Sequence, residues 1–294
     1  MPLPGPGPPL QPRRTALNPR FGAILAEALD RAGRLLLRRF GAVSISYKGR
    51  ADLLTQADLE SQRAILGLIR RKLPGHDYRA EEEGLKDTGA PYAWVIDPLD
   101  GTTNFAHGYP VACVSIALLH RGQPVLAGVL DPFRKERFLA EKGRGARLNR
   151  VPLRVSAARR LSESLLITGF PYDRAEHSRF YTEFFRSLMV RCHDVRRSGS
   201  AALDMAWVAA GRADGFWEFS LRPWDVAAGL LLVREAGGKV SDFRGRPWSG
   251  VAEFGRQTLA SNGRIHAAMR AVIRGILDHG PRTRAPRPRT GRRG

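Results

Sequence analysis

The segment from residue 94 to residue 104, WVIDPLDGTTN, constrains the fold of this chain more than any other. Its first three residues are apolar and partly β-branched, which indicates the end of a buried strand. The stretch DPLDG at 97–101 predicts that the strand breaks there, because proline cannot continue a ladder and glycine admits unusual backbone angles. The residues that follow predict the opening turn of a helix. A strand, an abrupt turn and a helix N-terminus are therefore expected in this order.

Two carboxylates in this segment can converge on one point. Asp97 and Asp100 are three residues apart at the end of the expected strand, and Mg²⁺ favours oxygen ligands that include one or two carboxylates. The free N–H groups at residues 101–104 would form an anion site beside them. The spacing alone leaves two alternatives open: metal-assisted phosphoryl chemistry, or an ordinary strand, turn and capped helix.

The chain of 294 residues has a formal net charge of +20, which raises the question of nucleic-acid binding. Nine of these charges are arginines before residue 21 or after residue 281, and +11 is left for the body. A basic protein attracts phosphorylated substrates as readily as nucleic acid, so the charge does not decide between them. The Pro- and Arg-rich ends at 1–19 and 278–294 are expected to be disordered.

The sequence carries no sign of export or of a membrane partner. No stretch approaches the roughly 20 apolar residues that a membrane-spanning helix needs, and the N-terminus lacks the apolar core of a secretory signal. With only Cys113 and Cys192, no disulfide framework is expected. We therefore expect a cytoplasmic protein.

Helical and strand periodicities divide the chain into two halves near residue 150. In residues 20–150, amphipathic helices precede a run of strands, which is the α+β pattern. In residues 151–277, strands and helices alternate, which predicts an α/β layer. The expected helices lie at 23–40, 53–73, 174–190, 199–211 and 224–236. One expected strand ends at 96, and another begins at 194. The other expected strands lie at 111–120, 125–130, 136–140, 164–168, 216–218 and 238–241.

Three motifs of this chain resemble those of the inositol monophosphatase family, whose members are Mg²⁺-dependent and typically lithium-inhibited phosphomonoesterases. DPLDGTTNF at 97–105 resembles the first signature of the family, and WDVAAG at 224–229 resembles the second. The pair Glu81-Glu82 precedes the first signature as it does in the family, and 52–58 resembles a further family segment. The resemblance extends over about residues 20 to 275. It implies a layered αβαβα sandwich of the inositol monophosphatase and fructose-1,6-bisphosphatase type, with the site between the halves, and a homodimer.

The resemblance also implies a set of metal ligands. Glu81, Asp97 and the Leu99 carbonyl are expected to hold a first Mg²⁺. Asp97, Asp100 and Asp225 are expected to hold a second, so that Asp97 bridges the two ions. A third Mg²⁺ near Glu81 is left open.

Catalytic and substrate-binding residues follow from the same resemblance. Asp58 is expected to orient Thr102, and this pair and Glu81 are expected to hold the metal-activated water that attacks phosphorus directly. The implied substrate-binding residues are Asp100, Gly101, Thr102, Thr103, Ala201, Glu218 and Asp225. Taken by themselves, these residues also allow plainer interpretations: Asp58 can cap a helix, and the three glutamates at 81–83 can form a solvated charged face. The three consecutive glutamates also allow the register to slip by one.

The expected reaction is hydrolysis of myo-inositol monophosphate to inositol and phosphate. Thr103 and Glu218 favour an inositol ring, and fructose-1,6-bisphosphate or a broader set of sugar phosphates is the alternative. The basic body and the behaviour of bacterial relatives also leave open a role of another class, contact with RNA or with a transcription complex. No RNA-binding motif is visible in the sequence.

Overall fold

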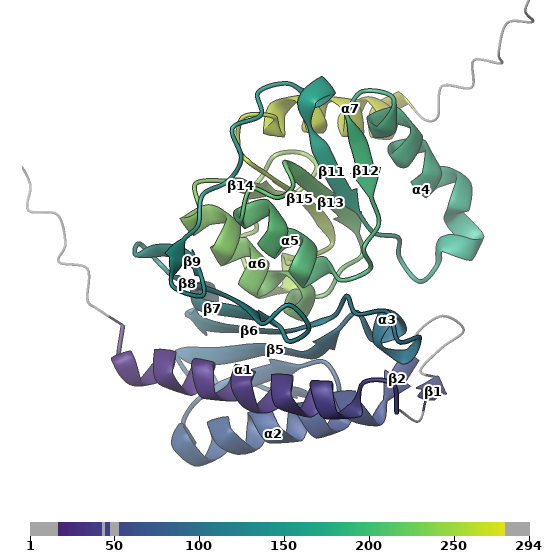
Figure 1. The fold of residues 1–294 in the computed structure, drawn as a ribbon. Helices are drawn as coiled ribbons and strands as arrows, with labels where there is room; N and C mark the ends of the chain where they lie inside the picture. Colours follow the sequence, from purple (N-terminus) through teal and green to yellow (C-terminus); the bar gives the residue numbers. More distant parts are fainter. Residues whose placement is uncertain (1–16, 43–44, 48–52, 280–294) are drawn as a thin grey trace, which may run out of the picture.

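Helices and sheets alternate in five layers in the computed structural model, which describes residues 17–42, 45–47 and 53–279 (Figure 1). An outer pair of helices, α1 (Pro19–Arg39) and α2 (Gln56–Lys72), covers one sheet. A central pair, α5 (Ala201–Ala209) and α6 (Pro223–Glu235), separates this sheet from a second one. A further outer pair, α4 (Arg174–Met189) and α7 (His266–His279), covers the second sheet. The predicted αβαβα sandwich is thus confirmed.

The first sheet has eight strands in the order β10-β9-β8-β7-β6-β5-β3-β4. Its strands are β3 (Asp77–Ala80), β4 (Gly84–Lys86), β5 (Tyr92–Asp100), β6 (Cys113–His120), β7 (Gln123–Asp131), β8 (Glu136–Glu141), β9 (Gly145–Leu148) and β10 (Val151–Pro152). A separate pair, β1 (Ile45–Tyr47) and β2 (Leu53–Thr55), precedes α2, and the short helix α3 (Thr102–Ala106) follows β5. Strand β5 is parallel to β3 and antiparallel to β6, so both of its edges are paired along the sheet.

The second sheet has five strands in the order β12-β11-β13-β15-β14. They are β11 (Leu165–Thr168), β12 (Asp194–Arg196), β13 (Gly215–Phe219), β14 (Lys239–Ser241) and β15 (Gln257–Ser261), with 3₁₀ turns at Leu161–Glu163 and Val251–Glu253. Strand β11 is parallel to both of its neighbours, as the alternation of strands and helices predicts. The sequence analysis assigns no element to β15 or α7.

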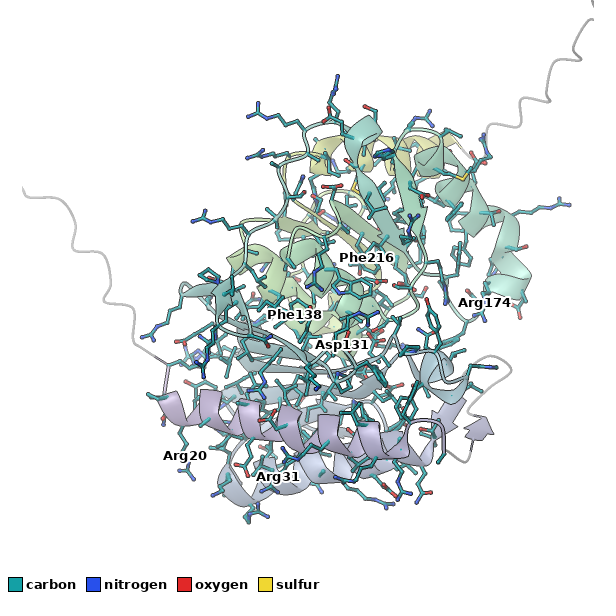
Figure 2. All side chains as sticks on the ribbon, viewed as in Figure 1. Arg20, Arg31, Asp131, Phe138, Arg174 and Phe216 are labelled. Carbon is teal, nitrogen blue, oxygen red and sulfur yellow. The ribbon has the colours of Figure 1, made fainter. Side chains whose placement is uncertain are left out.

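The two central helices are fixed by close packing. Most residues of α5 and α6 are buried, because each helix lies between two sheets. Figure 2 labels Phe138 of β8 and Phe216 of β13, which are both fully buried in the core around these helices. Gly229 of α6 lies so close to α5 that a Cβ there would be 2.6 Å from the Cβ of Met205. The helix starts that carry Ala201 and Asp225 are therefore held rigidly against the first sheet.

Strand β5 continues through Pro98, so the predicted break at residues 97–101 was wrong. Asp97 pairs with Ser115 and Asp100 pairs with Cys113, which gives β5 one extra residue in this interval. Proline is tolerated at such a bulge because the ladder is interrupted there anyway. Residues three apart in a regular strand face opposite sides, and the extra residue brings both aspartates to the same side.

A second correction concerns residues 53–73, which were expected to form one helix. Leu53–Thr55 forms strand β2, and α2 begins only at Gln56. The boundary has a local cause: the Thr55 N–H and hydroxyl both donate to the Asp58 carboxylate, at 2.8 and 2.6 Å, which caps the helix.

The outer ends of the expected halves, 20–150 and 151–277, lie close to helix ends, because α1 begins at Pro19 and α7 extends to His279. The expected boundary between the halves falls between β9 and β10 of the first sheet, and the division into these halves stays a prediction. Most of residues 1–19 and 278–294, which were expected to be disordered, lie outside the described residues. None of the helices in the described ranges combines the length and apolar character that a bilayer crossing requires.

His266, at the start of α7, is held in the neutral form. Its side chain is 2% exposed, and each ring nitrogen lies 2.9 Å from a serine hydroxyl, Ser241 at Nε2 and Ser261 at Nδ1. Ser241 donates its proton to the Asp242 carbonyl, so Nε2 must be the donor to Ser241. Ser261 accepts from the Gly263 N–H and is free to donate to Nδ1. A proton on Nδ1 would point at the hydroxyl proton of Ser261, and this hydrogen bond would be lost.

This arrangement predicts a loss of stability in mild acid. Burial, together with the charges of Lys239 and Arg270, lowers the pKa of His266 to about 4. Because the unfolded state then binds a proton that the folded state does not, stability should fall as the pH decreases from about 6.5 to about 4, by about 3 kcal/mol for this group. Urea unfolding of the wild type and His266→Gln should show a stability difference that shrinks by this amount between pH 7 and pH 4. A difference independent of pH would contradict the neutral assignment.

Candidate active site

A cavity of about 540 Å³ lies between the two halves of the molecule. Ten of the predicted site residues line it: Glu81, Asp97, Leu99, Asp100, Gly101, Thr102, Thr103, Ala201, Glu218 and Asp225. Asp58 is the one predicted site residue that does not line this cavity. A larger groove of about 1040 Å³ lies along α1 and the β8–β9 hairpin and contains none of the predicted site residues.

The register of β3 against β5 brings the first two acidic positions together. Ala80 pairs with Ile96 in the parallel ladder, and the Glu81 N–H donates to the Ile96 carbonyl at 3.2 Å. Glu81 therefore leaves β3 at the level where Asp97 leaves the regular part of β5. Both side chains reach the cavity at the same edge of the sheet.

The other half of the molecule contributes Asp225 from the first turn of α6 and fixes Asp100 through α5. The Asp100 Oδ2 accepts hydrogen bonds from the Ser200 hydroxyl and the Ala202 N–H, both at 2.7 Å. Asp225 accepts from the Arg222 N–H at 2.7 Å, which caps α6. The start of α5 thus orients Asp100, and the start of α6 orients Asp225.

Burial and mutual repulsion raise the pKa of the carboxylates in this cluster. Burial is the main cause at Asp97, followed by the charges of Glu81, Asp100 and Asp225, and its pKa lies well above the usual value. Asp225 is raised in the same way by burial, Asp100 and Glu81. Burial also raises the pKa of Asp100, against the opposing hydrogen bonds from Ser200 and Ala202. Four acidic side chains so close together are unfavourable unless a proton or a cation offsets their charge.

The donor set fits a hard divalent cation, because all of its ligand atoms are carboxylate or carbonyl oxygens. Within the described residues, no three acidic, histidine or cysteine side chains already stand in an arrangement that could hold a metal ion.

Asp58 reaches the site through Thr102. The Thr102 hydroxyl lies 3.0 Å from Asp58 Oδ1 and 3.0 Å from the Leu99 carbonyl, and its single proton can serve one of them at a time. The other Asp58 oxygen caps α2 through Thr55. Both interpretations of Asp58, as a helix cap and as a partner of Thr102, are therefore compatible with one conformation. Burial raises the pKa of Asp58 to about 6, against the hydrogen bonds from Thr55.

Helix α3 begins in a conformation that only glycine adopts without strain. Gly101 has φ of 91°, and a Cβ there would lie 2.8 Å from the Val111 carbonyl oxygen. Asn104 fastens the same turn to both halves, because its Nδ2 donates to the Val111 and Ser198 carbonyls, each at 2.8 Å. The first N–H groups of α3 have no acceptor within the helix and lie beside the acidic cluster.

The side chains of the three consecutive glutamates at 81–83 lie in different surroundings. Glu81 lines the cavity, whereas Glu82 and Glu83 do not. The Glu82 N–H donates to Gln62 Oε1 at 2.9 Å, and Glu83 forms an ion pair with Arg70 on the surface. Of the three glutamates, Glu83 therefore lies on a solvated charged face, which was the plainer interpretation of this charge run.

Glu218 of β13 also lines the cavity. Its side chain is 8% exposed and presses on Gly169, where a Cβ would lie 2.2 Å from both carboxylate oxygens. Burial raises the pKa of Glu218 well above its usual value, and the charge of Asp204 adds to this effect.

Ser200 and Arg197 lie outside the motifs given above, and the fold brings them to the cavity. Asn104 lies within the first signature, but its hydrogen bond to the Ser198 carbonyl follows only from the fold. Cys113 is fully buried with its sulfur 3.8 Å from Asp100 Oδ2.

Comparison with known proteins agrees with this geometry. The family model described as "Inositol monophosphatase family" matches residues 20–277. An inositol-1-monophosphatase of Synechocystis sp. is 49% identical over 254 residues, which are 85% of this chain and 87% of that protein. The Nus factor SuhB of Escherichia coli is 48% identical over 226 residues, which cover 76% and 85% of the two chains. A solved inositol monophosphatase from Anabaena is 43% identical, has a TM-score of 0.78, and is matched over 87% of this chain and 96% of its own.

The matched region contains both signature segments, all the cavity residues and both sheets. The fold and the sequence thus lead to the same assignment. This chain belongs to the inositol monophosphatase family and is a phosphatase.

Proposed function

We propose that this phosphatase hydrolyses myo-inositol monophosphate to inositol and phosphate with Mg²⁺ as its cofactor. The observation that carries the proposal is the convergence of Glu81, Asp97, Asp100 and Asp225 on one cavity that also contains the start of α3 and the buried Glu218. The name of the Synechocystis relative, inositol-1-monophosphatase, supports the same substrate.

The residues that would hold the cations are those of the acidic cluster. Glu81, Asp97 and the Leu99 carbonyl would hold a first Mg²⁺, Asp97, Asp100 and Asp225 would hold a second, and a third near Glu81 stays open. When bound, the cations would lower the pKa of water and offset the charge of the departing oxygen.

Groups of the protein itself would position the attacking water, the phosphate and the polyol. Glu81 and the Thr102 hydroxyl, oriented by Asp58, would hold the attacking water on one side of the phosphate. The N–H groups of Gly101, Thr102 and Thr103 would bind the phosphate oxygens, so that phosphorus faces the water in line. Glu218 and Ala201 would contact the polyol, whose oxygen leaves on the side of Asp225.

The glutamate register gives a first test of this proposal. Glu81→Gln should lower the rate of phosphate release by at least about thirtyfold, because it removes a charge from the cation site. Glu82→Gln and Glu83→Gln should stay within about threefold of the wild type, an effect under about 0.7 kcal/mol. Steady-state assays at saturating Mg²⁺ measure all three. A larger loss for Glu83→Gln than for Glu81→Gln would overturn the register.

Glu218 gives a test of substrate choice. Glu218→Gln should lower turnover of inositol monophosphate by about 10- to 100-fold, since a charge-assisted hydrogen bond contributes about 1.5–3 kcal/mol. Glycerol 2-phosphate offers little polyol to Glu218 and should lose much less. An equal loss on both substrates would show that Glu218 supports the structure of the site and does not recognise the ring.

A panel of phosphate esters assayed with Mg²⁺ tests the function itself. Inositol monophosphate should be the best substrate by kcat/KM, with fructose-1,6-bisphosphate and other sugar phosphates below it. If fructose-1,6-bisphosphate is hydrolysed best, the inositol assignment is wrong, and the proposed roles of the acidic cluster still hold.

A second candidate function is contact with a transcription complex, and the identity of 48% to the E. coli Nus factor SuhB favours it. This function needs no hydrolysis. An Asp97→Asn variant that releases no phosphate yet still binds RNA polymerase or its elongation factors would support it. Loss of binding in proportion to loss of hydrolysis would count against it.

Three finer expectations complete the proposal. We infer a cytoplasmic location, which the two free cysteines support because a reducing compartment keeps thiols unpaired. A homodimer and inhibition by lithium are inferred from the family alone. Sedimentation and a lithium titration of phosphate release would test these two.

A further inference from the structure

The carboxylate of Glu218 lacks a hydrogen-bond donor in the free protein. No described residue donates to it, although its side chain is 8% exposed and lines the cavity. A carboxylate is an acceptor only, so its donors must come from water or from a substrate. Glu218 alone can therefore recognise hydroxyl groups that donate, and it cannot recognise ring oxygens that need a donor.

Arg197 can supply the hydrogen-bond donors that such ring oxygens need. Its side chain is exposed to the same cavity and makes no hydrogen bond or ion pair with any described residue. Its positive charge nevertheless lowers the pKa of both Glu218 and Asp204, against the effect of burial. The guanidinium thus acts on these carboxylates without forming a hydrogen bond or ion pair with either, and Arg197 and Glu218 line the same cavity, where one ligand can contact both.

The other arginines around the cavity differ from Arg197. Arg174, labelled in Figure 2 at the start of α4, donates to the Pro171 carbonyl at 3.3 Å. Arg222 acts on Asp225, within the acidic cluster. Arg196, the neighbour of Arg197, pairs with Asp194 on the surface. Among the arginines of the described residues, Arg197 has the largest electrostatic effect on Glu218.

The guanidinium of Arg197 lies beside Gly199 and Asn104 at the wall of the cavity. Gly199 has φ of +90°, and a Cβ there would lie 2.8 Å from Arg197 Nη1 and 3.0 Å from Asn104 Nδ2. The Ser198 hydroxyl is bonded to Asp204, and the Ser198 carbonyl accepts from Asn104 at 2.8 Å. Asn104 belongs to α3, so the loop that carries Arg197 is fastened directly to the helix whose start would bind phosphate.

We propose that Arg197 is a specificity-determining residue, whose guanidinium donates hydrogen bonds to ring oxygens of the substrate that Glu218 cannot serve. The donor Arg197 and the acceptor Glu218 together recognise the orientation of neighbouring hydroxyls on a polyol ring. The inference rests on the proposed function, because it assumes a phosphorylated polyol in this cavity.

The test compares Arg197→Gln and Arg197→Lys with Arg274→Gln, a control in α7 whose side chain is 53% exposed. For inositol monophosphate, Arg197→Gln should lower kcat/KM by about 10- to 100-fold, mainly through a higher KM. For glycerol 2-phosphate the change should stay within about threefold, because that ester has no ring. Arg197→Lys should recover part of the loss, since lysine keeps the charge without the planar fork. The control should match the wild type on both substrates.

Three results would overturn the proposal. The first is an equal loss on both esters, which would indicate a structural role. The second is a loss confined to kcat, and the third is full recovery with lysine, which would indicate that charge alone matters.

Calorimetric binding of inositol 1-phosphate, with Ca²⁺ in place of Mg²⁺, separates this proposal from the proposed function. Binding by the wild type that is weakened about 10- to 100-fold in Arg197→Gln supports the role of Arg197 even if no hydrolysis is found. Equal binding by both proteins contradicts that role even if hydrolysis is found. Absence of binding by the wild type contradicts both proposals.

Discussion

Replacing Asp97 or Asp225 by asparagine is expected to reduce Mg²⁺-dependent phosphate release by about a thousandfold, which corresponds to about 4 kcal/mol of transition-state stabilisation. Asp97 would contact both cations, so the loss of its charge would weaken both cation sites at once. Steady-state assays over a range of Mg²⁺ concentrations measure the effect. Asp87→Asn, a change of an exposed aspartate outside the cavity, is the matched control and should retain wild-type activity.

The same variants should keep or gain stability without Mg²⁺. Repulsion from Glu81, Asp100 and Asp225 contributes to the raised pKa of Asp97, and an uncharged amide removes that repulsion. The Leu99 N–H, 3.0 Å from Asp97 Oδ1, can still donate to the amide oxygen. Thermal unfolding should therefore show a melting temperature equal to that of the wild type or higher. If either variant retains more than about a tenth of the wild-type turnover, an effect under about 1.4 kcal/mol, the assignment of that ligand is wrong.

Thr102→Val is expected to lower kcat by about 100-fold or more, in the range of a lost proton-transfer or water-positioning group. The substitution keeps the shape of the side chain and removes the hydroxyl that lies between Asp58 and the Leu99 carbonyl. Thr102→Ser should retain most of the activity because it keeps the hydroxyl. Thr182→Val, an exposed change on α4, should have no effect.

A double variant tests whether Asp58 and Thr102 act as one unit. If Asp58 acts only by orienting Thr102, Asp58→Asn combined with Thr102→Val should be no slower than Thr102→Val alone. Because Asp58 also caps α2 through Thr55, its replacement should in addition lower the stability of the protein by about 1 kcal/mol. Multiplicative losses in kcat would show that the two residues act separately.

The layered fold was predictable because its periodicities are local. The stripe of apolar residues in α1 and the Ala- and Leu-rich runs of α5 and α6 specify helices whatever the tertiary context. Strands β6 and β7 are equally clear. Helix α7 also carries a usable signal, since Met269, Ile273 and Ile276 recur at spacings of four and three residues and are all buried.

The bulge in β5 could not be predicted from local propensity. Asp-Pro at 97–98 is a strong turn signal, and it is overridden because β5 is paired on both sides and the bulge leaves the proline no ladder bond to make. The consequence for the site is large, since the extra residue is what allows Asp97 and Asp100 to face one cavity.

The site was predictable only where a contiguous motif marks it. The segments around Asp97 and Asp225 carry their own signature, and the short register of β3 against β5 leads Glu81 to the same edge. Asn104, Ser200 and Arg197 act through contacts with residues that are about 90 to 100 positions away in the chain or lie on another element. No pattern along the sequence encodes such contacts, so only the folded arrangement shows them.

The rate of phosphate release from myo-inositol 1-phosphate, measured across a Mg²⁺ titration, decides whether this protein is a Mg²⁺-dependent inositol monophosphatase. Release should be absent in a chelator, should rise with Mg²⁺ to saturation, and should have a higher kcat/KM than that of any other ester tested. No release from this substrate at any Mg²⁺ concentration, or release that continues unchanged in the chelator, would contradict it.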